Sequence, residues 1–417
     1  MRALIIGAGI GGLTTALLLH DAGLECEVHE QNESIRELGV GINLLPNSVA
    51  ELAGTGLLDR LTEVGVRTRE LRYAHRLGPE IQLRPCGLAA GFTLPQISIH
   101  RGRLQGVLLE AVRERLGPEA VRTGSRLTGL TQDSQGVRAS FAGPDGTPAG
   151  SERADVLVAA DGIHSAVRSA LFPGEGPPRW NGITMWRGAA DWPAFGTGDS
   201  MLVAGGNDAK LVVYPIGAGT SPDTRLTNWA VCVRTGKPGD PPPHRQDWSR
   251  PASADDIAAH LGRFRTPYVD HEGLARATGQ CFEFPMCDRD PLPFWSLGRV
   301  TLLGDAAHPM YPMGSNGAGQ AIMDAACLAR CLASHTDPEA ALRAYAGERL
   351  PVTSDVVLRN REGGPERVID EVERRAPDGF TRLEDVIDPA ELEKIVSGYA
   401  RASRQAAASR AAESESP

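Results

Sequence analysis

The first thirty residues combine a short apolar run, a glycine-rich turn and a helical pattern in a fixed order. Residues 3–6 predict a buried strand that leads directly into Gly7-x-Gly9-x-x-Gly12, and residues 13–19 have the spacing of an apolar helix. A second predicted strand, residues 26–29, ends on Glu30, roughly 20 residues beyond the glycines. This order predicts a strand–helix–strand unit that binds a dinucleotide.

Each residue type in this unit suits a nucleotide. Gly7 permits the tight turn, Gly9 leaves room for a pyrophosphate, and Gly12 allows the helix to pack closely on the strand. The amides at the start of the helix, including that of Ile10, face the phosphates, whose charge the helix dipole favours. Glu30 can accept hydrogen bonds from ribose hydroxyls, which indicates FAD or NAD rather than NADP at this site. The alternative is a glycine-rich turn that arose by chance.

Length, charge and cysteine content narrow the class of protein. With 417 residues the chain can hold two domains, and its net charge of −9 without clustered basic residues argues against nucleic acid as a partner. No run reaches the roughly 18 apolar residues of a membrane span. Seven scattered cysteines without a C-x-x-C pair indicate a reduced, cytoplasmic chain. Cys327, Cys331 and His335 have helical spacing, but their apolar neighbours favour a buried stripe, so no metal site is predicted.

Two later predicted strands also end in an acid beside a glycine. Residues 155–160 lead into Asp161-Gly162, and residues 299–303 lead into Gly304-Asp305. Open α/β sheets bind ligands at the carboxyl ends of such strands. A glycine-rich loop then opens another helix, where the amides of Gly317 and Ala318 would suit an anionic ring edge.

The middle of the chain has a different texture. Between about residues 180 and 284, helical periodicity fades, strand-like runs dominate and aromatic residues gather. We therefore predict an α/β fold with a discontinuous Rossmann-like nucleotide-binding domain (residues 1–70, 97–178 and 286–365) and an inserted, mainly antiparallel β-sheet domain for the substrate (71–96 and 179–285). C-terminal helices (366–400) and a disordered tail (401–417) complete the expected organisation.

The three glycine motifs in this order resemble the class A flavoprotein monooxygenases, the family of para-hydroxybenzoate and salicylate hydroxylases. The resemblance covers about residues 1–365 and implies the GR2 fold of para-hydroxybenzoate hydroxylase. Within the family the chain looks most similar to the phenazine branch, that of 5-methylphenazine-1-carboxylate 1-monooxygenase. The stretches behind this narrower similarity are residues 38–43, 98–102, 160–168, 182–188 and 310–314.

The resemblance implies one tightly bound FAD, with NADH or NADPH as a transient reductant and O2 as co-substrate. The residues implied to bind the FAD come from several motifs: Gly7, Gly9, Ile10, Gly12 and Glu30 for its ADP half; Arg36, Arg101, Asp161, Gly162 and Asp305 for the phosphates, the ribityl chain and, in the Asp161-Gly162 pair, also the nicotinamide; and Gly41, Ile42, Pro312, Gly314, Asn316, Gly317 and Ala318 around the isoalloxazine. On spacing alone, Arg101 could equally be a solvated arginine.

The implied reaction is oxygen transfer from a flavin C4a-hydroperoxide to an electron-rich aromatic ring. Water must be excluded, and helix amides must stabilise charge at the N1–O2 edge of the flavin. Asn43 and Pro312 fall close to the reactive edge of the flavin in the resemblance. Tyr214 and Trp186 are candidates for packing on the substrate, and Arg187 for pairing with a substrate carboxylate. Core aromatics and a structural ion pair are the alternative interpretations of these three residues.

The most specific prediction is an FAD-dependent monooxygenase that hydroxylates a phenazine-type aromatic carboxylate, with or without loss of the carboxyl group. The same chemistry on another aromatic or polyketide is an alternative, and so is a flavoprotein that only oxidises NADH or senses redox state. A small aromatic substrate is the expected partner, with neither nucleic acid nor membrane, and we expect a monomer or homodimer. Substrate-dependent NADH consumption separates the enzyme from the redox-sensing alternative.

Overall fold

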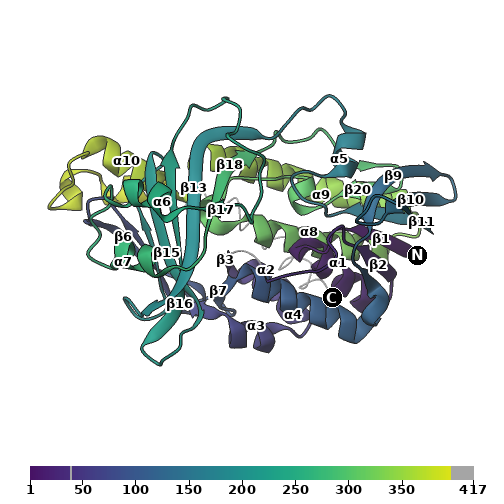
Figure 1. The fold of residues 1–417 in the computed structure, drawn as a ribbon, viewed down its shortest axis with the longest axis horizontal. Coiled ribbons are helices and arrows are strands. Elements are labelled where there is room, and N and C mark those ends of the chain that lie inside the picture. The colour runs from purple at the N-terminus through teal and green to yellow at the C-terminus, as the bar shows by residue number, and fades with distance from the viewer. Residues whose placement is uncertain (38–39, 396–417) are drawn as a thin grey trace.

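Two large sheets occupy opposite ends of the molecule. The structure is a computed structural model, and it describes residues 1–37 and 40–395. In Figure 1 the strands β1, β2 and β20 of one sheet lie to the right, and the strands β13, β15 and β16 of the other lie left of centre. The chain enters the second sheet twice and returns to the first each time, which confirms the predicted α/β fold with an inserted β-sheet region.

The first sheet has six strands, of which all but β19 run parallel to their neighbours. Their order is β19 (Ser296–Leu297), β20 (Val300–Leu302), β12 (Val156–Ala159), β1 (Arg2–Ile6), β2 (Glu25–His29) and β8 (Val121–Arg122). The three strands predicted before glycine motifs are therefore the adjacent strands β20, β12 and β1. Because parallel strands end at the same edge, their three glycine turns meet there.

Helices cover this sheet and supply most of its core. They are α1 (Ile10–Asp21), α4 (Arg101–Leu116), α8 (Gly317–Ser334) and α9 (Pro338–Arg361). Leu4 and Ile5 of β1, Leu13 and Leu17 of α1, and Leu328 of α8 are fully buried in one hydrophobic cluster. The apolar residues of the strand and of the helices thus pack against each other, because a parallel sheet must be covered by helices.

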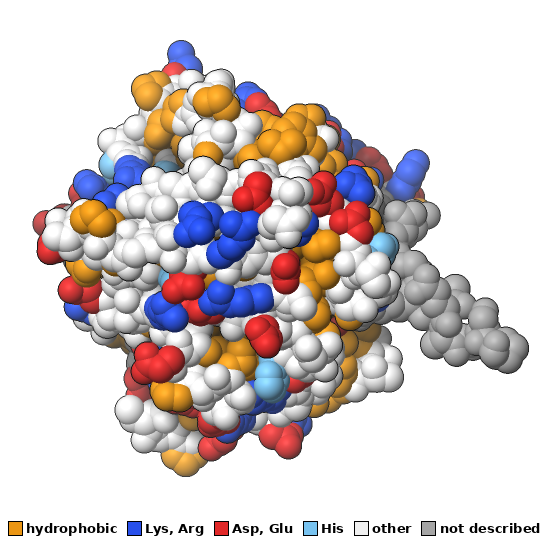
Figure 2. All heavy atoms as spheres, turned by 90° about the vertical axis from the view of Figure 1, so that its right-hand side faces the viewer, with side chains coloured by type: hydrophobic (Ala, Val, Ile, Leu, Met, Phe, Trp, Pro, Cys, Tyr) orange, Lys and Arg blue, Asp and Glu red, His pale blue; other side chains and the backbone are white. Residues whose placement is uncertain are grey.

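A three-stranded antiparallel meander extends from this end of the molecule. It consists of β9 (Arg126–Asp133), β10 (Gly136–Ala142) and β11 (Pro148–Ala154). Figure 2 shows acidic and basic side chains intermingled on this face, and ion pairs such as Arg122–Glu152 and Arg153–Asp133 join them. These two ion pairs link strands within the meander and the meander to β8.

The second sheet has eight strands and is antiparallel except where β14 pairs with β5. Its order is β17 (Pro251–Ala252), β18 (Cys281–Asp288), β13 (Arg179–Pro193), β16 (Thr224–Arg234), β15 (Ala209–Ala218), β14 (Ser200–Ala204), β5 (Glu70–Ala74) and β6 (Glu80–Pro85). Helices α6 (Ala254–Leu261) and α7 (His271–Ala277) contribute Ile257 and Leu274 to a hydrophobic cluster on one face. On the other face, α10 (Arg367–Arg375) contributes Val368 and Val372 to a cluster that covers the strands near β5. The centre of that face is not covered by this cluster and is directed toward the first sheet.

Smaller elements join the two sheets. A three-stranded sheet is formed by β3 (Gly41–Leu44), β7 (Gln96–His100) and β4 (Val66–Thr68), and the remaining helices are α2 (Pro46–Gly54), α3 (Leu58–Val64) and α5 (Ala166–Leu171). After α10 the chain forms only a short 3-10 turn (Leu383–Asp385) before helical residues begin at 389. The end of the predicted C-terminal helices and the predicted tail lie outside the described residues. Within those residues, no helix is both long and apolar enough to cross a membrane.

Candidate active site

A cavity of about 310 Å³ lies where the glycine turns of the first sheet meet the open face of the second sheet. Both halves of the predicted site contribute to its wall. The predicted residues that line it are Gly9, Ile10, Gly41, Ile42, Asn43, Arg101, Gly162, Arg187, Tyr214, Asp305, Pro312, Asn316, Gly317 and Ala318. Residues separated by more than 300 positions in sequence are thus brought to one place.

The glycine turn has the geometry that a dinucleotide requires. Gly7 has a φ of 104°, and a Cβ there would lie 2.4 Å from the carbonyl oxygen of Ala160. A Cβ on Gly12 would lie 1.9 Å from the carbonyl oxygen of Gly7, so helix and strand touch through backbone. A Cβ on Gly9 would meet no atom within 4 Å, because this residue faces the cavity at the start of α1. The turn is therefore closed on the protein side and open on the side from which phosphates would approach.

Glu30 and Arg36 follow the turn but do not line the cavity. Glu30 accepts hydrogen bonds from the amide of Ala8 at 2.9 Å and from the amide of Asn32 at 2.8 Å, so its carboxylate braces the turn. Oε1 also accepts from Asn32 Nδ2 at 2.7 Å, so it is Oε2 that keeps a second lone pair for a ribose hydroxyl. Arg36 is exposed and donates to Ser34 Oγ at 3.2 Å, so its contact with a cofactor stays a prediction.

Asp305 faces the cavity beside Arg101. The protein around the cavity desolvates the Asp305 carboxyl and raises its pKa, and the interactions with His308 and Arg101 oppose that shift. Behind this turn, the carboxylate of Asp324 lies 2.5 Å from His308 Nε2 and 2.7 Å from Arg349 Nε, and it accepts the amide of Gly304. These buried groups hold the Gly304-Asp305 turn in place, so that the Asp305 carboxylate faces the cavity and can accept hydroxyl hydrogens there.

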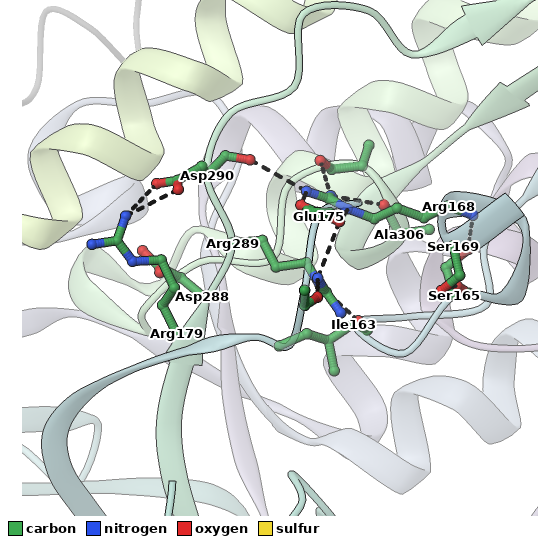
Figure 3. A network of polar contacts seen from close by, with 12 residues as sticks. Ile163, Ser165, Arg168, Ser169, Glu175, Arg179, Asp288, Arg289, Asp290 and Ala306 are labelled. Carbon is green, nitrogen blue, oxygen red and sulfur yellow. Dashed lines mark hydrogen bonds and ion pairs between the residues drawn. The ribbon is translucent and has the colours of Figure 1, made fainter. Parts of the chain in front are cut away.

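Two arginines clamp the second glycine turn to the third (Figure 3). Arg168 is 1% exposed and donates to the carbonyl oxygens of Ala306 and Ala307 at 3.0 and 2.7 Å. Glu175 pairs with both Arg168 and Arg289, and Arg289 Nε donates to the carbonyl of Ile163 at 3.1 Å. The clamp fixes the spacing between the two loops that carry Gly162 and Asp305.

Asp161 has a local role in the same region. Its Oδ2 accepts the amide of Ala166 at 2.8 Å, at the start of α5, and it does not line the cavity although Gly162 does. Burial raises the pKa of Asp161. The predicted contact of Asp161 with a cofactor therefore has no support from its position, whereas Gly162 lines the cavity and its contact stays a prediction.

The start of α8 forms the floor between the two halves. Asn316 precedes the helix, and Gly317 and Ala318 present its first amides to the cavity. Asn43 lies beside them: it accepts from Ser98 Oγ, and its Nδ2 lies 3.5 Å from Ser315 Oγ. Gly314 is not among the lining residues. Since helix N-termini attract negative charge, this floor suits an anionic ring edge as predicted.

Arg187 and Tyr214 project from the second sheet into the cavity. Arg187 is 5% exposed, its guanidinium lies 4.2 Å from the centre of the Trp248 ring, and its Nη2 donates to the Trp248 carbonyl at 3.2 Å. Burial, with the charge of Arg101, lowers the pKa of Arg187 to about 9, so it remains a cation at neutral pH. Its Nε has no hydrogen-bond partner within the described residues. Burial raises the pKa of Tyr214, so its hydroxyl stays protonated and can donate.

Trp186 does not reach the cavity, which corrects its prediction as a substrate contact. Its ring stacks on His260 of α6 with ring centres 4.8 Å apart, and Nε1 lies 3.3 Å from Glu283 Oε2. Adjacent residues of a strand point to opposite faces of the sheet, so Trp186 and Arg187 cannot both face one ligand. Trp186 belongs to the core under α6 and α7.

The cavity residues that escaped the sequence analysis include the charged Lys210 and Glu366 and the aromatic Trp248. The sequence does give a signal for Lys210, because the chain contains only three lysines and this one lies in an apolar strand. It is four residues before Tyr214, so strand alternation puts both side chains on the same face of the sheet. Trp248 lies in the proline-rich loop before β17, and Glu366 lies beyond α9, so no local pattern connects either to the sheet.

A glycine cradle, two helix N-termini and an accessible aspartate together define a site for a flavin dinucleotide. The chain belongs to the FAD-binding domain family, whose model matches residues 1–360. FAD is thus its cofactor, and the residues above fit it.

Similar proteins of known activity narrow the class of FAD-dependent enzyme to which the chain belongs. The phenazine 1,6-dicarboxylic acid hydroxylase PhzS of Lysobacter antibioticus is 44% identical over 86% of this chain and 88% of its own length. A 3-amino-4-hydroxybenzoate 2-monooxygenase of Streptomyces platensis is 37% identical over 88% of each chain. HpxO of Klebsiella pneumoniae, solved with FAD and uric acid, superposes with a TM-score of 0.72 at 25% identity, covering 95% of this chain and 93% of its own. These similarities confirm the predicted FAD-dependent aromatic monooxygenase class and its phenazine branch.

Proposed function

We propose that the protein uses NAD(P)H and O2 to hydroxylate a planar aromatic carboxylate of the phenazine type. The observation that carries this proposal is Arg187, a cation buried in the cavity wall with no carboxylate partner within the described residues. A buried charge without a partner is costly, and a bidentate contact with a substrate carboxylate would offset that cost. The names of the two curated relatives also specify aromatic carboxylic acids.

Bound FAD supplies the redox chemistry, accepting electrons from the nicotinamide and activating oxygen. The protein residues orient the ring and exclude water. Arg187 would hold the carboxylate, the Tyr214 hydroxyl would donate to a ring substituent, and Met185 and Val212 would contact the ring faces. The amides of Gly317 and Ala318 would stabilise negative charge at the flavin edge.

Product mass spectrometry tests the proposal. The yellow protein is incubated with NADH, 18O2 and phenazine-1-carboxylate, with and without a 5-methyl group. We expect a product that carries one 18O atom, and replacement of the carboxyl by hydroxyl would assign a decarboxylating hydroxylation. NADH oxidation that is unchanged by any aromatic carboxylate, with hydrogen peroxide as the only product, would contradict the proposal and favour an NADH oxidase.

Two alternatives remain distinct. Oxygen incorporation into a different aromatic or polyketide, but not into phenazines, would keep the chemistry and change the substrate. NADPH in place of NADH is compared in the same assay, since Glu30 concerns the FAD ribose and not the reductant.

A further inference from the structure

Lys210 and Glu366 form a buried ion pair in the wall of the cavity. Lys210 lies on β15 and is 4% exposed, and Glu366 lies in the 3-10 turn Gly364–Glu366 and is 8% exposed. The ammonium donates to Glu366 Oε2 and lies 3.1 Å from Met313 Sδ, while Glu366 Oε1 lies 3.3 Å from the amide of Gly314. A buried ion pair contributes little net stability, so its presence in a ligand cavity needs a further reason.

The charges in the cavity sort into two neutral pairs and one excess cation. The acidic and basic side chains that line it are Arg101, Asp305, Lys210, Glu366 and Arg187. Arg101 and Asp305 interact with each other, and Lys210 pairs with Glu366. Arg187 has no carboxylate partner within the described part of the chain. In the substrate half, Lys210 and Glu366 cancel each other's charge, so Arg187 is left to neutralise one anionic group of a substrate and not two.

Strand register separates the two anchors. Lys210 pairs with Cys232 of β16, which pairs with Met185 of β13, and Arg187 lies two residues farther along β13. Two strand spacings and one step of two residues put their Cα atoms about 12 Å apart, on the same face of the sheet. Since both side chains are long, their polar ends can contact two different substituents of one flat ring system.

The pair offers both a donor and an acceptor. An ammonium has three N–H donors, and the contacts of Lys210 with Glu366 and the weak sulfur acceptor Met313 leave one for a ligand. Glu366 keeps lone pairs for a ligand donor, but its negative charge would lie close to any second carboxylate. We infer that Lys210 and Glu366 form a specificity-determining pair that accepts a neutral donor–acceptor group, such as a ring nitrogen, hydroxyl or amino group, and disfavours a second carboxylate. This inference rests on the proposed function.

Equilibrium dialysis of the holoenzyme against phenazine-1-carboxylate and phenazine-1,6-dicarboxylate tests the inference. The wild type should bind the monocarboxylate more tightly. Glu366→Gln keeps the shape and the acceptor for Gly314 but removes the charge, and should shift the affinity ratio toward the dicarboxylate by about tenfold. Lys210→Met should shift the affinity ratio further toward the monocarboxylate. This second variant tests the inference if Glu366→Gln does not fold. Glu362→Gln, an exposed carboxylate nearby, should leave the ratio unchanged.

The binding data distinguish a failure of the inference about Lys210 and Glu366 from a failure of the proposed function. If the wild type binds the monocarboxylate but neither Glu366→Gln nor Lys210→Met changes the ratio, the pair is only structural and the inference is overturned. A wild type that prefers the dicarboxylate, as the name of the Lysobacter relative would suggest, also overturns it. A wild type that binds neither compound overturns the proposed phenazine substrate, and this inference with it.

Discussion

The two halves of the cavity are built in different ways. The cofactor half presents backbone: Gly9 at the start of α1, and Gly317 and Ala318 at the start of α8. The substrate half presents side chains, with Arg187 and Lys210 projecting from a sheet whose strands are far apart in sequence. Backbone contacts depend on local turn geometry, whereas side-chain contacts depend on register between distant strands. The first half therefore tolerates few substitutions, and the second can change specificity without a change of fold.

The largest expected effect distinguishes two glycines of one turn. In Gly12→Ala the new methyl collides with the carbonyl of Gly7, so we expect no folded, soluble protein. In Gly9→Ala the methyl enters open space on the cofactor side, so the fold should survive while FAD affinity falls on the order of tenfold. Circular dichroism and flavin absorbance measure the two outcomes. A yellow, stable Gly12→Ala protein would show that backbone contact is not what closes the turn.

Removal of the Asp324 charge should be the next largest effect. Asp324→Asn leaves Arg349 buried with a weaker partner, which should cost about 3 kcal/mol of unfolding free energy. Burial raises the pKa of Asp324, but His308 and Arg349 outweigh it and hold that pKa below its usual value. The stabilisation is therefore present above the pKa of the unfolded carboxyl and is lost as the pH falls through the folded pKa.

Thermal melts of both proteins across pH 3–8 check this prediction, with the pH range chosen to cover the roughly 3.9 of an unperturbed aspartate. The difference in melting temperature should shrink toward acid. A difference that is constant with pH would show that the loss comes from packing rather than from charge.

A smaller effect is expected at Asp305, which faces the cofactor without supporting the fold. Asp305→Ala removes a hydrogen-bond acceptor and should weaken FAD binding by about tenfold, with little change in melting temperature of the apoprotein. Fluorescence of released flavin after dilution measures the affinity. A variant that retains its full complement of FAD would remove Asp305 from the cofactor site.

The cofactor half was largely predictable because its signals are contiguous. A strand, three glycines and a helix lie within 20 residues, and the resulting turn has the predicted contacts at Gly7 and Gly12. The three strands predicted before glycine motifs are adjacent in the sheet. Because they are parallel, their carboxyl ends lie at one edge, and the three glycine turns meet there. Arg36 was assigned from similarity alone, and its exposed position does not support the contact.

The substrate half was predictable only in part. Arg187 and Trp186 were both proposed, although alternation along a strand allows only one of them to face the cavity. The ion pair of Lys210 and Glu366 joins residues 156 positions apart, and no sequence pattern specifies that distance. Such contacts follow from how the C-terminal segment packs beside the sheet, which is a property of the whole fold.

The proposed function depends on whether Arg187 binds the carboxylate of an aromatic substrate. The most direct test compares the dissociation constants of phenazine-1-carboxylate and unsubstituted phenazine for the wild-type and Arg187→Met holoenzymes, with Trp186→Phe as the control on the opposite face of the sheet. We predict that Arg187→Met weakens the carboxylate by on the order of 100-fold and leaves unsubstituted phenazine within about twofold, while Trp186→Phe changes neither. Equal weakening of both ligands, or no weakening of the carboxylate, would show that Arg187 does not bind the substrate carboxylate.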